Sequence, residues 1–260
     1  MYKKKRLLNG FLDDDLKLEV TRMRKEYDDL YKIIEKMNKL FYSIEENYEK
    51  TKPTDVDVYV RSTFSQIHMS SQSYIILLER GLYDDSQVIL RSMYDKVIKC
   101  LYAINNNSIE VITQESIKRK ISLFNFIDKN EMYDYISKEK LYEYKRKMEK
   151  EQKKDERGRP IKISKLIETI SDLGIKEAYI HYSLLSEYVH NSIGVVGNRV
   201  IEDGIDILIN QNIDHGNFKN EILKMYLCMQ YVVGSICNYL KLEDSKQEFD
   251  KLIEELLKLI

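Results

Sequence analysis

Only two prolines and nine glycines interrupt this chain of 260 residues. Sandwiches and barrels need frequent turns, and Gly, Pro, Asn and Asp supply most of them. The scarcity of Gly and Pro therefore excludes an all-β fold and disfavours a doubly wound sheet. Because 43% of the residues are hydrophobic, the chain can still form a sizeable core. The sequence predicts an all-α protein, a single bundle of about eight helices.

The charges and cysteines limit the classes of protein to which the chain can belong. Forty-two basic residues balance 43 acidic ones, so any contact with nucleic acid must be local. The three cysteines form no paired framework, and the basic N-terminus has no apolar stretch typical of a signal peptide, which together predict a cytoplasmic protein. The uncharged run 225–240 is shorter than the roughly 20 residues of a membrane span, so we expect a buried helix there and no membrane contact.

The N-terminal region has an apolar residue every three or four positions from about Phe11 to Lys50, which predicts one long helix. Pro53 ends it, so we divide the chain into 1–54, a long N-terminal helix, and 55–260, the bundle domain. The apolar seam suits either a helix of the bundle or a coiled-coil dimer arm. The first is favoured because the seam can pack within one chain. As an arm, the helix would dock a protein partner or a second copy.

Breakers and caps define the remaining helices. The patterns predict helices over 56–80 (ended by Gly81), 84–105 (capped by Asp84 or Asp85), 108–128, 131–155, 164–173, 175–193, 217–242, and from Asp244 or Ser245 onward. Asp203-Gly204 between β-branched residues predicts a small β-hairpin near 199–209. The predicted core includes Leu78, Leu90, Tyr94, Val97, Leu101, Leu185, Tyr188, Val189, Leu227 and Val232.

Common catalytic and metal-binding motifs are absent. The sequence contains no phosphate-binding glycine loop, no HExxH and no GxSxG, and its four histidines lack metal-ligand spacing. We therefore expect no metal and no cofactor.

Two helical segments carry candidate site residues. Arg91 and Asp95 lie one turn apart at the edge of an apolar arc, which predicts an ion pair with either a structural role or a role in a site. His190 shares a helix face with Ser183, Ser186 and Glu187, and Glu187 would orient its imidazole. The alternative is an ordinary histidine at a helix C-terminus.

A basic segment gives a third candidate. Residues 138–162 hold eleven Lys or Arg and six Asp or Glu, with tyrosines between them. Such a segment fits either a phosphate backbone or an ordinary solvated helix. The candidate nucleic-acid contacts are Lys145, Arg146, Lys153, Lys154, Arg157 and Arg159.

Two stretches resemble known families. "LLERGLYDDSQVILRSMYD" and the later "YSLLSEYVHNS" resemble an uncharacterised family of helical bacterial proteins with an Arg-Ser-x-x-acidic helix and a Ser-x-x-x-His helix end, over roughly 70–240. Asp95 stands where that family more often has Glu. The arrangement is also distantly similar to the HEPN superfamily, many of whose members are dimeric, metal-independent ribonucleases. Their Arg and His share one helix, whereas Arg91 and His190 here are on different helices.

Three functions follow as expectations. One is a HEPN-like ribonuclease of bacterial defence or a toxin, in which His190 takes the ribose 2′-OH proton and Arg91 holds the phosphate of an RNA substrate. Another is a non-catalytic binding module or scaffold in a defence or regulatory complex. The last is a sensor of a small ligand or nucleotide. We expect Arg91, Asp95, Glu187 and His190 to form one polar cluster.

Overall fold

The computed structural model describes most of the chain. The described residues are 14–47, 52–134, 136–152, 173–189, 200–203, 206–209 and 218–259. Within them the protein forms nine α-helices and one β-hairpin, which confirms the predicted all-α fold. The helices are α1 (Asp14–Glu26), α2 (Asp28–Glu46), α3 (Asp55–Glu79), α4 (Tyr83–Asn106), α5 (Glu110–Lys129), α6 (Lys138–Glu151), α8 (Leu173–Val189), α10 (Phe218–Leu240) and α11 (Glu243–Leu257).

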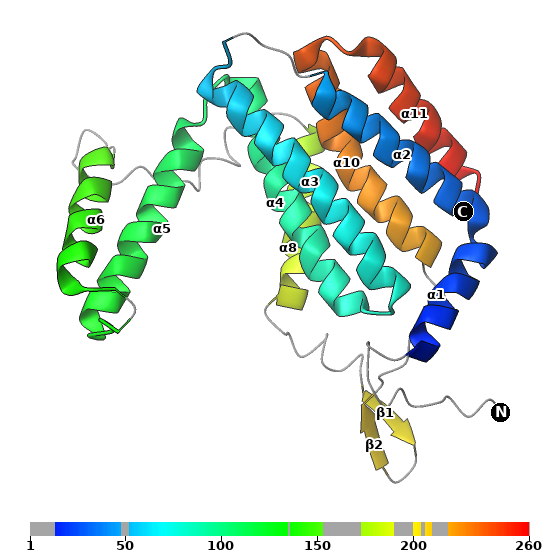
Figure 1. The fold of residues 1–260 in the computed structure, drawn as a ribbon, viewed down its shortest axis with the longest axis horizontal. Helices are drawn as coiled ribbons and strands as arrows, with labels where there is room; N and C mark the ends of the chain where they lie inside the picture. Colours follow the sequence, from blue (N-terminus) through cyan, green and yellow to red (C-terminus); the bar gives the residue numbers. More distant parts are fainter. Residues whose placement is uncertain are drawn as a thin grey trace.

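The bundle consists of α2, α3, α4, α8, α10 and α11 (Figure 1). Helix α4 packs against α3, α8 and α10, while α11 packs against α2 and α10. The stripes of these helices that face inward are apolar, and side chains such as Met37, Phe41, Val97 and Met229 are fully buried. Burial of these stripes stabilises the bundle, because most of the stability of a helix in a protein comes from the packing of its apolar face.

The N-terminal region is two helices instead of the single helix predicted over 11–50. Helices α1 and α2 meet at Tyr27, whose backbone (φ −106, ψ 31) leaves the helical region. The bend accompanies packing of the Tyr27 and Tyr31 rings 5.5 and 5.9 Å from the ring of Phe218, a residue from the far end of the chain. The apolar seam of α2 is buried within the bundle of this same chain.

Local chemistry fixes several helix ends. Thr54 and Asp57 form a capping box at the start of α3, and Gly81 follows its end with φ 69, a conformation that glycine adopts without strain. The predicted caps of α4 and α11 are wrong. Leu82 and Leu242 precede these helices without a side-chain hydrogen bond, and the acidic residues lie inside the first turn.

The predicted helix over 131–155 begins later than expected. Glu131 has φ 52, and α6 starts only after Ser137, whose side chain accepts from the Lys140 N–H. The predicted helix over 164–173 falls outside the described residues except at Leu173, which starts α8.

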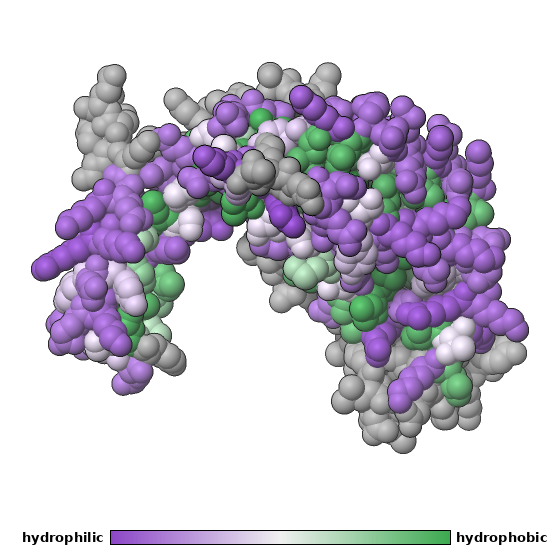
Figure 2. Space-filling model, turned by 45° about the horizontal axis from the view of Figure 1, so that its top comes forward, coloured by the Kyte–Doolittle hydropathy of each residue, from purple (hydrophilic) through white to green (hydrophobic). Residues whose placement is uncertain are grey.

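Helices α5 and α6 form an antiparallel pair that projects from the bundle, here called the α5–α6 arm (Figure 1). Only Gln114, Ile117 and Leu141 are buried in its two helices. Figure 2 shows apolar surface on the side of the arm that faces the hollow beside the bundle. Leu123 and Phe126 of α5 are 55% and 56% exposed.

The predicted β-hairpin is present. Strands β1 (Val200–Asp203) and β2 (Asp206–Ile209) pair antiparallel, with Asp203 opposite Asp206 across the turn. In the described part of the chain, no helix is long and apolar enough to cross a membrane.

The predicted core is mostly correct. Leu227 is an error, since it is 38% exposed, and Leu185 is only partly buried. The side chains of Tyr188 and Val189 lie outside the described residues. The predicted core residues that are buried are Leu78, Leu90, Tyr94, Val97, Leu101 and Val232.

Candidate functional site

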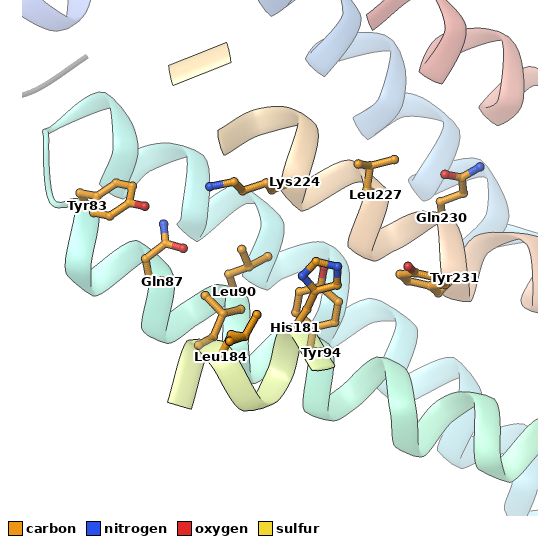
Figure 3. Close-up of a pocket in the computed structure, with 11 residues that line it drawn as sticks. Tyr83, Gln87, Leu90, Tyr94, His181, Leu184, Lys224, Leu227, Gln230 and Tyr231 are labelled. Carbon is orange, nitrogen blue, oxygen red and sulfur yellow. The ribbon is translucent and has the colours of Figure 1, made fainter. Parts of the chain in front are cut away.

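A groove of about 600 Å³ lies between α4, α8 and α10. Each helix contributes one stripe, because residues three or four positions apart share a helix face. Figure 3 shows Tyr83, Gln87 and Lys224 at one end of the groove, and Gln230 and Tyr231 at the other. The lining residues are Tyr83, Gln87, Leu90 and Tyr94 of α4, His181, Leu184 and Leu185 of α8, and Lys224, Leu227, Gln230 and Tyr231 of α10.

The middle of the groove is apolar and aromatic. Leu184 of α8 and Leu227 of α10 are 61% and 38% exposed, although both are large apolar side chains. The rings of Tyr94 and His181 stack with their centres 5.6 Å apart and their planes inclined by 20°. Burial raises the pKa of Tyr94, so its phenol is protonated at neutral pH. This part of the groove therefore offers apolar contact and an aromatic face.

A buried carboxylate organises the end that holds Gln87. Glu221 is 2% exposed and accepts hydrogen bonds from Tyr74 Oη (2.8 Å), Gln87 Nε2 (3.0 Å) and Lys224 Nζ (2.6 Å). We call these four residues the Glu221 cluster. Burial raises the pKa of Tyr74, and the charge of Glu221 raises it further, so the phenol stays a donor. A buried charge requires such partners, and here they also fix the side chains that face the groove.

Arg91 joins α4 to α8 beside the groove. Its Nε donates to Ser186 Oγ (3.0 Å) and its Nη2 donates to Tyr182 Oη (2.9 Å). The Arg91 Cζ also lies 4.6 Å from the centre of the Tyr182 ring, within cation–π distance. Arg91 thus holds α8 against α4 and positions the wall that carries His181 and Leu184.

The predicted ion pair between Arg91 and Asp95 does not form. Asp95 Oδ2 instead accepts from Lys99 Nζ at 2.6 Å, one turn further along α4. The spacing along one helix suggested the pair, but hydroxyl groups of α8 satisfy the guanidinium from across the helix interface.

The structure brings together only part of the predicted polar cluster. Arg91 does reach the small polar stripe of α8 at Ser186, whereas Asp95 pairs elsewhere. His190 and the side chain of Glu187 lie outside the described residues, so their place in a cluster stays a prediction.

The two predicted nucleic-acid contacts that the structure describes lie far from the groove. Lys145 and Arg146 lie on α6, in the arm and away from α4 and α8 (Figure 1). Lys153, Lys154, Arg157 and Arg159 lie outside the described residues. Among the residues that can be assessed, no group of three or more His, Cys, Asp or Glu could hold a metal ion.

Gln87, Tyr74 and Glu221 were not among the residues predicted from the sequence. Gln87 follows no motif, but Glu221 left a readable signal. It stands in the apolar stripe of α10, three residues after Phe218 and four before Met225, both of which are buried. A single carboxylate in such a stripe predicts buried donors on a neighbouring helix.

Comparison with known proteins identifies a family for this chain. The model of a family of unknown function, DUF5677, matches residues 57–207. This segment includes α4 and α8, two of the three helices that line the groove, and it confirms the expected resemblance to an uncharacterised helical family. No curated protein and no solved structure matches the chain.

Proposed function

The chain belongs to the DUF5677 family, and we propose that it is a binding module that takes a small, largely apolar ligand into the groove between α4, α8 and α10. One observation carries the proposal: apolar walls and a carboxylate-organised polar end share a hollow of about 600 Å³. Small-molecule sites typically enclose about 300–1,000 Å³ and combine apolar walls with a few fixed polar groups.

The exposed leucines support this function. Leu184 and Leu227 belong to opposite walls, and both remain accessible to water. A ligand in the groove would cover apolar surface on both helices, at a gain of about 25 cal/mol per Å² of area removed from water. The groove therefore offers a driving force for binding that is separate from the folding of the bundle.

The attachment of α8 suggests how binding could be sensed. Arg91 holds α8 through two hydrogen bonds to side-chain hydroxyls, while Leu184 remains exposed on its groove side. A ligand that contacts α8 and α10 together would strengthen the attachment of α8. Ligand binding would then shift the equilibrium of α8 from a loosely attached state toward a firmly attached state.

A fluorescent probe tests the binding function. Nile red, a neutral fluorophore, should bind the folded protein at neutral pH, and Leu184→Glu should weaken its affinity by about tenfold or more, since the charge would lie in the apolar wall. Ile180→Glu is the matched control, because Ile180 is 56% exposed on the same helix but does not line the groove. No binding by the unaltered protein, or an equal loss in both variants, contradicts the proposal.

A metal-independent ribonuclease is the second candidate. It is favoured by the contact of Arg91 with Ser186, which stands four residues before His190 in the sequence. Within the described residues the hydrogen-bond partners of Arg91 are neutral hydroxyl groups, and a guanidinium binds a phosphate more strongly than it binds such groups. In this function His190 is the base, and Lys145 and Arg146 contact the RNA.

Cleavage of RNA in the presence of a metal chelator tests this candidate. His190→Ala should abolish cleavage, while His181→Ala, nine residues earlier in the sequence, should not. Because Arg91 also holds α8, loss of activity in an Arg91 variant would not distinguish catalysis from positioning. Absence of cleavage by the unaltered protein contradicts the candidate.

A further inference from the structure

We infer that the groove selects a neutral, flat heterocycle that donates an N–H hydrogen bond to Oε1 of Gln87. The inference rests on the proposed binding function and specifies the ligand of the same groove. It depends on the orientation of one buried amide, on the charge balance of the Glu221 cluster, and on the shape of the apolar walls.

The amide of Gln87 has one allowed orientation. Its Nε2 donates to Glu221 Oε2 at 3.0 Å and lies 3.3 Å from Ser86 Oγ. A carboxylate only accepts hydrogen bonds, so the NH₂ group, and not the carbonyl oxygen, must face Glu221. The carboxylate thereby turns Oε1 of Gln87 away from the cluster.

Oε1 of Gln87 is an acceptor in the groove wall. Gln87 is 2% exposed and lines the groove, and Figure 3 shows its amide oxygen on the side of the other lining residues. Within the described part of the protein, this oxygen has no hydrogen-bond partner. Because Oε1 of Gln87 is not fully enclosed, it opens to the groove. A donor on a ligand can therefore replace water as its partner, whereas a ligand without a donor would cover the oxygen and leave it unpaired.

The charges at this end favour a neutral ligand. Glu221 and Lys224 form an ion pair at 2.6 Å, so the cluster has no net charge. Arg91 directs its guanidinium to Tyr182 and Ser186 and does not line the groove. A charged ligand would lose its hydration without meeting an unpaired opposite charge among the described lining residues.

The walls favour a flat ring. Leu90, Leu184 and Leu227 provide apolar surface, and the exposed His181 extends the face of the Tyr94–His181 stack into the groove. Aromatic rings prefer such stacked or edge contacts. A ring that fills the apolar middle can place an N–H group at the Gln87 end.

Two ring compounds of nearly equal shape test the inference. Indole has an N–H donor where benzofuran has an oxygen, so their binding should differ only through a donor-dependent contact. In NMR titrations we expect the protein to bind indole about tenfold more tightly than benzofuran, because bound benzofuran would cover the acceptor without pairing it. Gln87→Met, which removes the acceptor at similar volume, should abolish this preference. Gln230→Met is the matched control at the other end of the groove and should retain it.

The possible results are distinguishable. Equal affinity of the unaltered protein for both compounds overturns the inference but leaves the groove as a binding site. If neither compound binds although Nile red does, the ligand class is wrong. If none of the three binds, the proposed function itself fails. If Gln87→Met does not fold, the ratio of the affinities of the unaltered protein for indole and benzofuran still tests the inference.

Discussion

The bundle and the α5–α6 arm are both helical but bury very different amounts of side chain. Helix α10 of the bundle buries a continuous apolar stripe, whereas the two arm helices bury only Gln114, Ile117 and Leu141. Isolated helices are marginal in water, so the bundle is stabilised by its tertiary packing and the arm by fewer, more exposed contacts.

The carboxylates of the two regions also differ in their burial. In the bundle, Glu221 and Glu79 are buried, and Glu79 accepts two hydrogen bonds from Arg24 and one from Tyr31. In the arm, Asp128 accepts from Tyr133 and Tyr142 in a solvated setting. The buried carboxylates of the bundle hold their hydrogen-bond partners in places from which packing excludes water. A selective site requires polar groups that are held in this way.

The largest contrast should come from removing one aromatic ring in each region. Phe41 is fully buried among Phe64, His68, Tyr226 and Phe249, so Phe41→Ala should lower the free energy of unfolding by about 3–5 kcal/mol. Phe126→Ala in the arm, where the ring is 56% exposed, should change it by less than about 0.5 kcal/mol. Urea unfolding followed by circular dichroism measures both, and similar losses would refute the contrast.

A smaller contrast should come from the carboxylates. Glu221→Gln removes the charge that orders Tyr74, Gln87 and Lys224, and we expect a loss of about 1–3 kcal/mol in the free energy of unfolding. The matched change is Glu115→Gln, which breaks the pair with the exposed Arg119 and should cost less than about 1 kcal/mol. A larger loss from the arm variant would show that burial does not set the difference.

Weakening the attachment of α8 to α4 should have an effect that is confined to α8. Arg91→Met keeps the aliphatic stem but removes two hydrogen bonds, each with a net contribution of about 0.5–1.5 kcal/mol. Amide hydrogen exchange should become faster in α8 and stay unchanged in α10. Lys99→Met, which breaks the pair with Asp95 on the same helix, is the control. Unchanged exchange in α8 would show that Arg91 does not hold it.

The smallest effect should be a pH dependence at the tip of the arm. Hydrogen bonds from Tyr133 and then Tyr142 hold the pKa of Asp128 below its usual 3.8. The resulting stabilisation is therefore present above pH 3.8 and is lost as the pH falls through the lower pKa of the folded arm. NMR titration of the Asp128 carboxyl carbon should show a higher pKa in Tyr133→Phe, and no change in Tyr144→Phe. An unshifted value in both variants would contradict the assignment.

The sequence was a good guide to the fold where the determinants are local. Scarce Gly and Pro indicated helices, Pro53 separated α2 from α3, and Gly81 marked the end of α3. The bend at Tyr27 could not be predicted from the local pattern, because the rings that pack there include Phe218 from a distant segment.

The candidate site was less predictable because three separate segments form it. Arg91 was correctly chosen as a residue that needs a partner, but helix spacing suggested Asp95 where α8 provides Ser186 and Tyr182. Leu227 was assigned to the core from its apolar character, although it faces the groove. The acceptor on Gln87 follows from the position of Glu221 in space, which no spacing in the sequence encodes.

A crystal structure of the protein soaked with indole tests the central claim most directly, because it compares the groove with the apolar face of the arm in one experiment. The account predicts a ring between α4, α8 and α10, with its nitrogen within about 3.2 Å of Oε1 of Gln87. Indole bound at Leu123 and Phe126 of the arm, with an empty groove, would contradict it.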